Sequence, residues 1–153
     1  MSVCVGIGYD SHRLVEGERL LLGGVEIEHD RGLAGHSDAD VLTHAVIDAV
    51  LGAGGTGDIG TMFPDSEERW RDADSVDMLR TALGSVSGRV LNVDATVICE
   101  QPQIGPHRAE IESNLSEVLS ARVSVKASSN EGMGFIGRGE GIACVAVAVI
   151  ESN

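Results

Sequence analysis

The chain has 153 residues, of which 42% are hydrophobic and 23% are charged, as in a folded globular protein and unlike a disordered or fibrous one. Its 24 acidic and 11 basic residues leave a net charge of −13, which argues against nucleic acid or an anionic membrane as a partner. The longest apolar run, Ile142–Ile150, is too short to cross a membrane, and the first residues lack the pattern of a signal peptide, so we expect a cytoplasmic protein.

The first half of the chain predicts a strand, a hairpin and a helix, in that order. Apolar residues alternate over Val3–Tyr9, and Gly23-Gly24 separates two short apolar segments in the manner of a hairpin turn. Ser37 is a suitable N-cap for a helix from Asp38 to about Leu51, which ends at the glycines that follow. Thr56–Asp74 has no clear periodicity, and loops of this length are usually functional or mobile.

The second half alternates between helices and strands. The predicted elements are a helix over Ser75–Val86, a strand over Val90–Glu100, a helix from Pro106 to about Leu119, and strands over Val123–Ala127 and Gly141–Glu151. A glycine-rich loop, Ser128–Glu140, joins the last two strands. Neither a repeat nor a linker is evident, so we expect a single domain over residues 1–153, with an α/β fold whose sheet is covered by helices on one face.

A metal site is one interpretation of three polar residues. Asp10 and His12 are two residues apart on an extended segment, so their side chains point to the same side, and both residue types bind zinc. If His44, from the polar face of the first helix, joined them, three ligands and one open position would resemble a catalytic zinc site. His36 would then lie near the amide groups of the helix start, which attract anions. The alternative is a solvent-exposed loop and helix face, which spacing alone favours.

Two further stretches carry side chains suited to phosphates or hydroxyl groups. Carboxylates occur in Asp58-Ile59-Gly60 and Phe63-Pro64-Asp65, and short polar side chains occur in Ser128-Ser129-Asn130-Glu131. Arg138 lies between two glycines shortly afterwards. The motifs of a dinucleotide-binding fold, a P-loop and an α/β-hydrolase are missing, which argues against these three enzyme classes.

Seven segments match one known family in order along nearly the whole chain. They are GIGYDSH (6–12), LLLGGVEI (20–27), GLAGHSDADVLTHAVIDAVLGA (32–53), GDIGTMFPDS (57–66), NVDATVI (92–98), PH (106–107) and FIGRGEGIAC (135–144). The sequence thereby resembles the 2-C-methyl-D-erythritol 2,4-cyclodiphosphate synthases of the non-mevalonate isoprenoid pathway. The resemblance implies a small α+β domain with a mixed four-stranded sheet and an extra N-terminal hairpin. It also implies a homotrimer with active sites at the subunit interfaces.

The resemblance assigns roles to individual residues. Asp10, His12 and His44 match the ligands of one Zn²⁺ per subunit, and a second cation, Mg²⁺ or Mn²⁺, would bind the substrate diphosphate. His36 and Ser129 match the pair that stabilises the transition state. The implied substrate-binding residues are Asp10, His12, His36, Ser37, Asp58, Ile59, Gly60, Phe63, Asp65, Glu100, Pro102, Gln103, Ile104, Gly105, Ser128, Asn130, Glu131, Phe135 and Arg138. Among these, Gln103 replaces a frequent lysine, and Ser128-Ser129-Asn130 replaces three threonines.

The implied reaction is an intramolecular phosphoryl transfer. The 2-phosphate of 4-diphosphocytidyl-2-C-methyl-D-erythritol 2-phosphate attacks the β-phosphorus, closing a cyclic diphosphate and releasing CMP. The attacking oxygen is already ionised, so no general base is needed, and Asp48 is expected to support His44 or the neighbouring loop. Two other functions remain open: a zinc-dependent phosphoesterase, and a non-catalytic trimeric protein that binds nucleotides or isoprenoid diphosphates. In the latter, Phe135 and Arg138 could line a cavity on the trimer axis.

The net charge of −13 is expected to repel any such phosphate substrate. With a single lysine in the chain, charge neutralisation is expected to come from bound metal ions, from the start of the helix capped by Ser37, and from an arginine.

Overall fold

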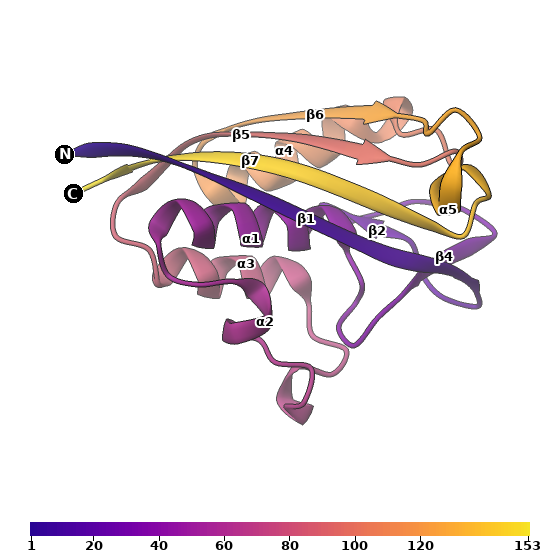
Figure 1. Cartoon of the computed structure of the whole chain (residues 1–153), viewed down its shortest axis with the longest axis horizontal. Coiled ribbons are helices and arrows are strands. Elements are labelled where there is room, and N and C mark those ends of the chain that lie inside the picture. The colour runs from indigo at the N-terminus through magenta and orange to yellow at the C-terminus, as the bar shows by residue number, and fades with distance from the viewer.

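The computed structural model describes all residues, Met1–Asn153, and its centre is a five-stranded mixed sheet (Figure 1). The strand order is β4-β1-β7-β5-β6, and all neighbours are antiparallel except β5 and β6, which are parallel. The strands of this sheet are β1 (Ser2–Glu16), β4 (Arg31–Ala34), β5 (Arg89–Ile98), β6 (Arg122–Ser128) and β7 (Gly141–Ser152). The separate hairpin consists of β2 (Leu21–Leu22) and β3 (Val25–Glu26).

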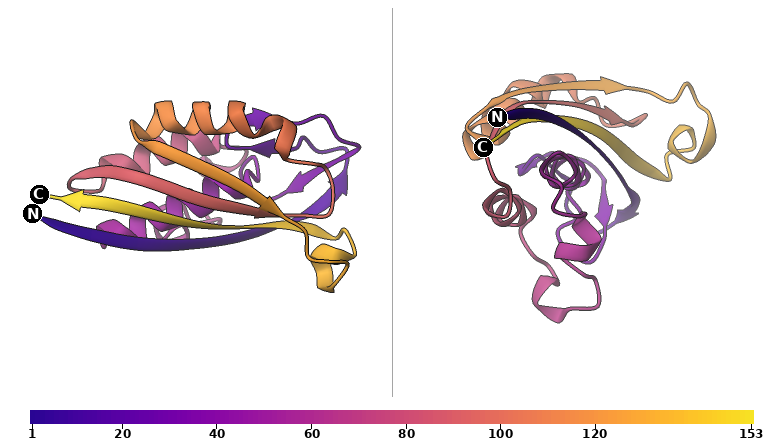
Figure 2. Two further views of the ribbon diagram at one scale, coloured as in Figure 1. Left: turned by 90° about the horizontal axis from the view of Figure 1, so that it is seen from above. Right: turned by 60° about the vertical axis from the view of Figure 1, so that its left-hand side comes forward.

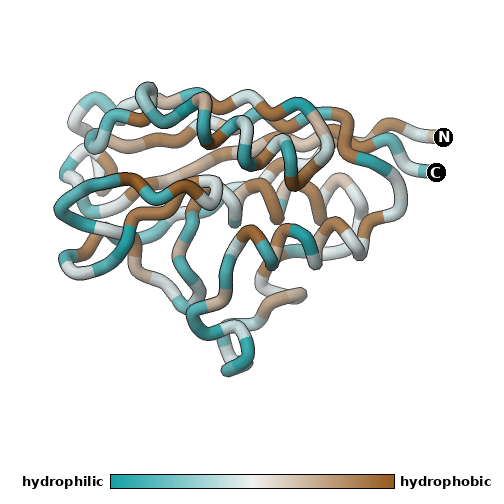
Figure 3. The backbone as a smooth tube through the Cα atoms, turned by 180° about the vertical axis from the view of Figure 1, so that it is seen from behind, coloured by the Kyte–Doolittle hydropathy of each residue, from teal (hydrophilic) through white to brown (hydrophobic).

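Helices cover one face of this sheet, and Figure 2 shows α1 and α3 lying beneath its curved surface. The helical elements are α1 (Val41–Gly54), α2 (Ile59–Met62), α3 (Ser75–Gly84), α4 (Arg108–Leu119) and α5 (Gly134–Gly137), with 3₁₀ turns η1 (Glu68–Trp70) and η2 (Gly105–His107). One cluster of 36 buried hydrophobic residues fills the space between the layers. The hydrophobic segments concentrate on the strands and on α1, whereas the protruding loop between α2 and α3 is largely hydrophilic (Figure 3). No helix is both long and apolar enough to span a membrane.

Helix α1 lies directly against two glycines of β1. A Cβ atom added at Gly6 would be 2.1 Å from the carbonyl oxygen of Ala49, and one added at Gly8 would be 1.9 Å from that of Ala45. Both distances are far below van der Waals contact, so only glycine permits this approach. Because His44 precedes Ala45 on the same helix, the close packing also brings His44 toward the residues that follow Gly8 on β1.

This packing leads to a first prediction. Replacing Gly8 by alanine should lower the free energy of unfolding by about 1–3 kcal/mol, because α1 must move away from the sheet. Urea denaturation measures the effect. Gly84→Ala is a matched control, because a Cβ there meets nothing within 4 Å and the residue ends α3. Equal stability of the two variants would contradict the close packing of α1 on β1.

Along β1 and β7 the other face of the sheet is bare and apolar. Val3, Val5, Ile7 and Tyr9 are 57–68% exposed, and they all point to this side of β1. Val145, Val147 and Val149 of β7 pair directly with Tyr9, Ile7 and Val5 and are half-buried. Together these seven residues form a contiguous stripe, which we call the bare stripe. Exposed apolar surface of this kind usually marks an interface.

The sequence predicted the order of the main elements, but several boundaries differ. The sheet has five strands and not four, because β4 is only four residues long and was not recognised in Arg31–Ala34. Helix α1 begins at Val41 with Asp40 as N-cap, continues through Gly52 and is capped by Gly55, so the prediction that Ser37 caps it was wrong. The predicted loop at Thr56–Asp74 contains α2 and η1. Pro106 opens η2, after which α4 begins.

Candidate metal centre and substrate clefts

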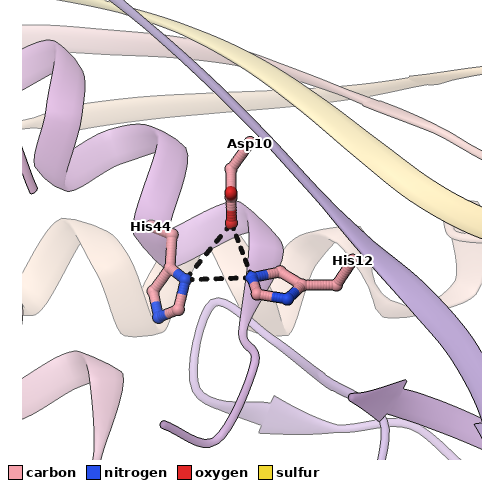
Figure 4. A group of neighbouring side chains, drawn as sticks. All are labelled: Asp10, His12 and His44. Carbon is pink, nitrogen blue, oxygen red and sulfur yellow. Dashed lines mark hydrogen bonds and ion pairs between the residues drawn. The ribbon is translucent and has the colours of Figure 1, made fainter. Parts of the chain in front are cut away.

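Asp10, His12 and His44 bring three potential metal ligands together, as Figure 4 shows. The Oδ2 atom of Asp10 lies 2.8 Å from Nε2 of His12 and 3.2 Å from Nδ1 of His44, and the two nitrogen atoms are 3.2 Å apart. Atoms bound at about 2.0–2.1 Å to a tetrahedral zinc ion lie about 3.3 Å from one another. The triangle therefore has nearly the size that a four-coordinate zinc ion requires, with one position left open.

The hydrogen bonds of the two rings favour metal binding. Nδ1 of His12 lies 2.9 Å from the carbonyl oxygen of Ala34, which can only accept, so this nitrogen carries the proton and Nε2 is left with a lone pair. Nε2 of His44 lies 2.7 Å from Oγ of Ser75, on the side of the ring away from the triangle. The neutral rings can thus present lone pairs to a common centre, and such outer hydrogen bonds are usual for histidine ligands. The triad is therefore a possible binding site for a divalent metal ion.

Electrostatics in the triangle favours positive charge. Burial raises the pKa of Asp10, but hydrogen bonds and charge interactions with His12 and His44 outweigh it and lower that pKa to about 2. Burial lowers the pKa of His12, but its hydrogen bond and charge interaction with Asp10 outweigh this effect, so the pKa is raised. The same negative field that holds a proton on His12 would hold a metal cation between the three atoms.

The N-terminus of α1 is not the open anion-binding site that was expected there. The Asp40 carboxylate is fully buried and accepts hydrogen bonds from the backbone and hydroxyl groups of Thr43, at 2.9 and 2.8 Å. It also accepts hydrogen bonds from the amides of Gly23 and Gly24, which fixes the β2–β3 hairpin to the helix. An acidic side chain therefore already occupies the helix N-terminus, and the expectation that this end attracts a phosphate was wrong.

A cavity of about 520 Å³ opens from the metal triad. The predicted residues His36, Ser37, Ile59, Gly60, Phe63 and Asp65 line it with the triad, as does Pro64 of the stretch Phe63-Pro64-Asp65. Gly35, Trp70 and Met78, which the sequence did not single out, also line it. We call it the metal cleft. Nε2 of His36 donates to the carbonyl oxygen of Glu67 at 3.2 Å, which holds the ring at the base of the protruding loop. No lysine or arginine lines this cleft.

Two predicted carboxylates have structural contacts near the metal cleft. Asp58 is exposed and caps α2, accepting two hydrogen bonds from Thr61, which lower its pKa, and it does not line the cleft. Asp48 accepts a hydrogen bond from the amide of Ile59 at 3.0 Å. It therefore supports the neighbouring loop, which is one of the two roles expected for it.

A second cavity, of about 340 Å³, lies where β5 and β6 end. We call it the distal cleft. Its lining includes the predicted substrate-binding residues Glu100, Pro102, Gln103, Ile104, Gly105 and Ser128, together with Cys99 and with Ser129, which was predicted to act with His36. Like the metal cleft, it has no lysine or arginine in its lining, and the two clefts share no residue. His36 and Ser129, predicted to act as a pair, therefore lie in different clefts of one chain.

The remaining predicted residues lie around the glycine-rich loop. Glu100 accepts hydrogen bonds from the amides of Asn130 and Gly132, at 2.9 and 3.3 Å, and so fixes the loop next to the distal cleft. The amide of Glu131 donates to Oγ of Ser129 at 3.2 Å. Phe135 lines a small hollow of about 200 Å³ beside His12 and Glu140, and Arg138 forms an ion pair with Glu140 at 2.6 Å.

Comparisons with known proteins identify the family. A model of the YgbB family matches residues 3–151. The 2-C-methyl-D-erythritol 2,4-cyclodiphosphate synthases of Rubrobacter xylanophilus and Salinibacter ruber are 54% and 53% identical to the chain, covering 96% and 97% of it and 94% and 98% of their own lengths. A solved synthase structure in its CDP-bound form has a TM-score of 0.85 and 34% identity, covering 96% of this chain and 99% of that one. The resemblance seen in the sequence is confirmed: the chain belongs to the YgbB family.

Proposed function

We propose that the protein converts 4-diphosphocytidyl-2-C-methyl-D-erythritol 2-phosphate into 2-C-methyl-D-erythritol 2,4-cyclodiphosphate and CMP. The observation that carries this proposal is the Asp10–His12–His44 triad, which opens into a cavity large enough for a small phosphorylated substrate. Relatives that share more than half of its residues are named as this synthase. The chain is thus an enzyme of isoprenoid precursor biosynthesis.

The triad would hold a Zn²⁺ ion, whose role when bound is to polarise a phosphate oxygen of the substrate as a Lewis acid. The chain's own groups bind and orient the substrate. His36 and Ser37 both line the metal cleft; the His36 ring is held there by its bond to Glu67, and the Ser37 hydroxyl group can donate to a phosphate oxygen. No side chain has to remove a proton, because the attacking phosphate oxygen is already an anion. Folding the substrate so that its two ends meet is the main task of the site.

Charge neutralisation supports a second cation. Neither cleft has a lysine or arginine in its lining, although the substrate carries three phosphoryl groups and the protein has a net charge of −13. A hard divalent cation, Mg²⁺ or Mn²⁺, on the substrate diphosphate would supply this charge, as in other phosphoryl transfers. We therefore propose one Zn²⁺ per subunit and one such cation with each substrate.

The distal cleft is proposed to bind the cytidine end. Its lining includes several small residues, among them Gly105, Ser128 and Ser129, as suits recognition of a base by backbone groups. The CDP-bound form of the solved relative supports a cytidine nucleotide as ligand of this family. Because Gln103 is uncharged, the negative charge of the nucleotide phosphates would be neutralised by the divalent cation.

A homotrimer would unite the two clefts. In one chain the metal triad and Ser129 lie in separate cavities. The apolar bare stripe on β1 and β7 is exposed to solvent unless another subunit packs against it. Packing three bare stripes around a common axis would bury this surface and form closed cyclic symmetry. We propose that each active site joins the metal cleft of one subunit to the distal cleft of its neighbour, and that residues 1–153 act as one domain.

The reaction itself provides the test. We expect CMP release from the cytidyl substrate in the presence of Zn²⁺ and Mg²⁺, with phosphorus NMR showing the cyclic diphosphate as the sole second product. Omitting Mg²⁺ and Mn²⁺ should abolish turnover while zinc remains bound. A linear product would identify a phosphoesterase, and nucleotide binding without turnover would identify a binding protein; either result overturns the proposal.

A further inference from the structure

The buried Ser75 contacts the outer side of the His44 ring and is itself bound by the half-buried Asp38. Ser75 is the first residue of α3 and has no solvent exposure, and its Oγ atom lies 2.7 Å from Nε2 of His44. Asp38 accepts a hydrogen bond from the Ser75 hydroxyl group and a second from the Ser75 amide at 2.9 Å. A third donor, the amide of Asp40, lies 3.2 Å from the same carboxylate. Residues from three separate segments thus form one chain of hydrogen bonds that ends at His44.

The chemistry of these groups determines the direction of each hydrogen bond. An ionised carboxylate can only accept, so the Ser75 hydroxyl hydrogen points toward Asp38. The oxygen of Ser75 then offers its lone pair to His44, and Nε2 of His44 must carry the proton. Nδ1 is consequently unprotonated, and this is the nitrogen that faces Asp10 and His12. The carboxylate therefore selects the one neutral form of the ring that can bind a metal through Nδ1.

Ser37 is the competing partner of the same nitrogen. Its Oγ atom lies 3.0 Å from Nε2 of His44, farther than that of Ser75. Its one other hydrogen bond comes from the amide of Ala39 at 3.5 Å, and no carboxylate orients its hydroxyl hydrogen. The Ser37 hydroxyl can rotate and can donate to a ligand in the metal cleft, whereas that of Ser75 cannot.

Backbone hydrogen bonds next to the pair hold the wall of the metal cleft. The amide of Asp38 donates to the carbonyl oxygen of Ala73 at 3.1 Å, and the amide of Asp72 donates to that of His36 at 2.8 Å. The segment that carries His36 is thus tied to the residues just before α3.

We propose that Asp38 and Ser75 are positioning residues, which keep His44 in the Nε2-protonated form and aim its Nδ1 at the metal. This inference rests on the proposed metal site, and the two can fail separately. Outer hydrogen-bond partners of metal ligands typically contribute 10- to 100-fold to metal affinity. Ser75 and Asp38 act in series on one ring, so their contributions should not be independent.

The first experiment measures zinc affinity by competition with a chromophoric chelator. Ser75→Ala should weaken zinc binding by about 10- to 100-fold. Ser37→Ala, which removes the competing hydroxyl group, and Ser85→Ala, the same change at the other end of α3, should bind zinc as the unmodified protein does. Unchanged affinity in S75A, with circular dichroism showing an intact fold, overturns the proposal. Failure of the unmodified protein to bind zinc overturns the metal site and the pair together.

A double-mutant cycle tests whether the two residues act in series. Asp38→Asn keeps the shape of the side chain but removes its charge, and its amide nitrogen can only donate. It should weaken zinc binding in the same direction as S75A. The double variant should bind zinc no more weakly than S75A alone, because without the hydroxyl group Asp38 cannot act on His44. Affinity losses that add would contradict the proposed series.

A third measurement needs no substitution. Long-range proton–nitrogen NMR spectra of the zinc-loaded protein, labelled with ¹⁵N-histidine, report which ring nitrogen carries the proton. We expect Nε2 protonated and Nδ1 metal-bound for His44, and the reverse for His12. A proton on Nδ1 of His44 would overturn the proposal regardless of how the variants fold.

Discussion

Replacing His44 by alanine is expected to abolish zinc binding and to lower CMP release by more than the 10- to 100-fold typical of losing an outer hydrogen-bond partner. Asp10 and His12 would remain as two ligands, one fewer than the catalytic zinc pattern requires. The fold should persist, because the His44 ring faces the triad and Ser75 and is not part of the hydrophobic cluster. Zinc content measured by elemental analysis and a CMP-release assay report the two effects.

His107 provides the matched control for His44→Ala. It lies in η2, and its side chain makes no capping hydrogen bond to α4. His107→Ala should therefore retain one zinc ion per subunit. Full zinc content and normal turnover in H44A would show that the triad is not the metal centre.

Replacing Ile7 by aspartate is expected to convert the proposed trimer into monomers and to abolish turnover. Ile7 is 68% exposed in the middle of the bare stripe, so a carboxylate there costs little in a single chain. At a closed interface it would be buried without a partner, which is strongly unfavourable. Zinc should still bind, because all three ligands belong to one chain. Sedimentation, zinc content and CMP release distinguish these effects.

Thr81→Asp is the corresponding control on the helical layer. Thr81 is exposed on α3, on the covered side of the sheet, so the same added charge should leave assembly and turnover unchanged. A trimeric, active I7D variant would show that the bare stripe is not the subunit interface.

The sequence predicted local features better than contacts between distant segments. Alternation identified β1, and the spacing of Asp10 and His12 placed both side chains on one side of it. Their meeting with His44 depends on α1 lying against Gly6 and Gly8, which no local pattern encodes. The metal triad was therefore one of two interpretations of the residues, and the family resemblance was needed to favour it.

The errors also arise from long-range contacts. Ser37, Asp38 and Asp40 are all good N-cap residues, and the amides of Gly23 and Gly24 select Asp40 by surrounding its carboxylate. The role of Ser75 depends on contacts with residues more than thirty positions earlier in the chain. Trp70 lines the metal cleft from a loop without periodicity, so no pattern indicated it.

Each active site is proposed to combine the metal cleft of one subunit with the distal cleft of another. The direct test mixes two inactive variants, His44→Ala and Ser129→Trp; the tryptophan is intended to fill the distal cleft. After subunit exchange, every mixed cyclic trimer contains one interface between an intact metal cleft and an intact distal cleft. We predict that CMP release reappears on mixing and is absent from either variant alone. If mixed trimers form but remain inactive, the metal cleft of one subunit does not act with the distal cleft of its neighbour.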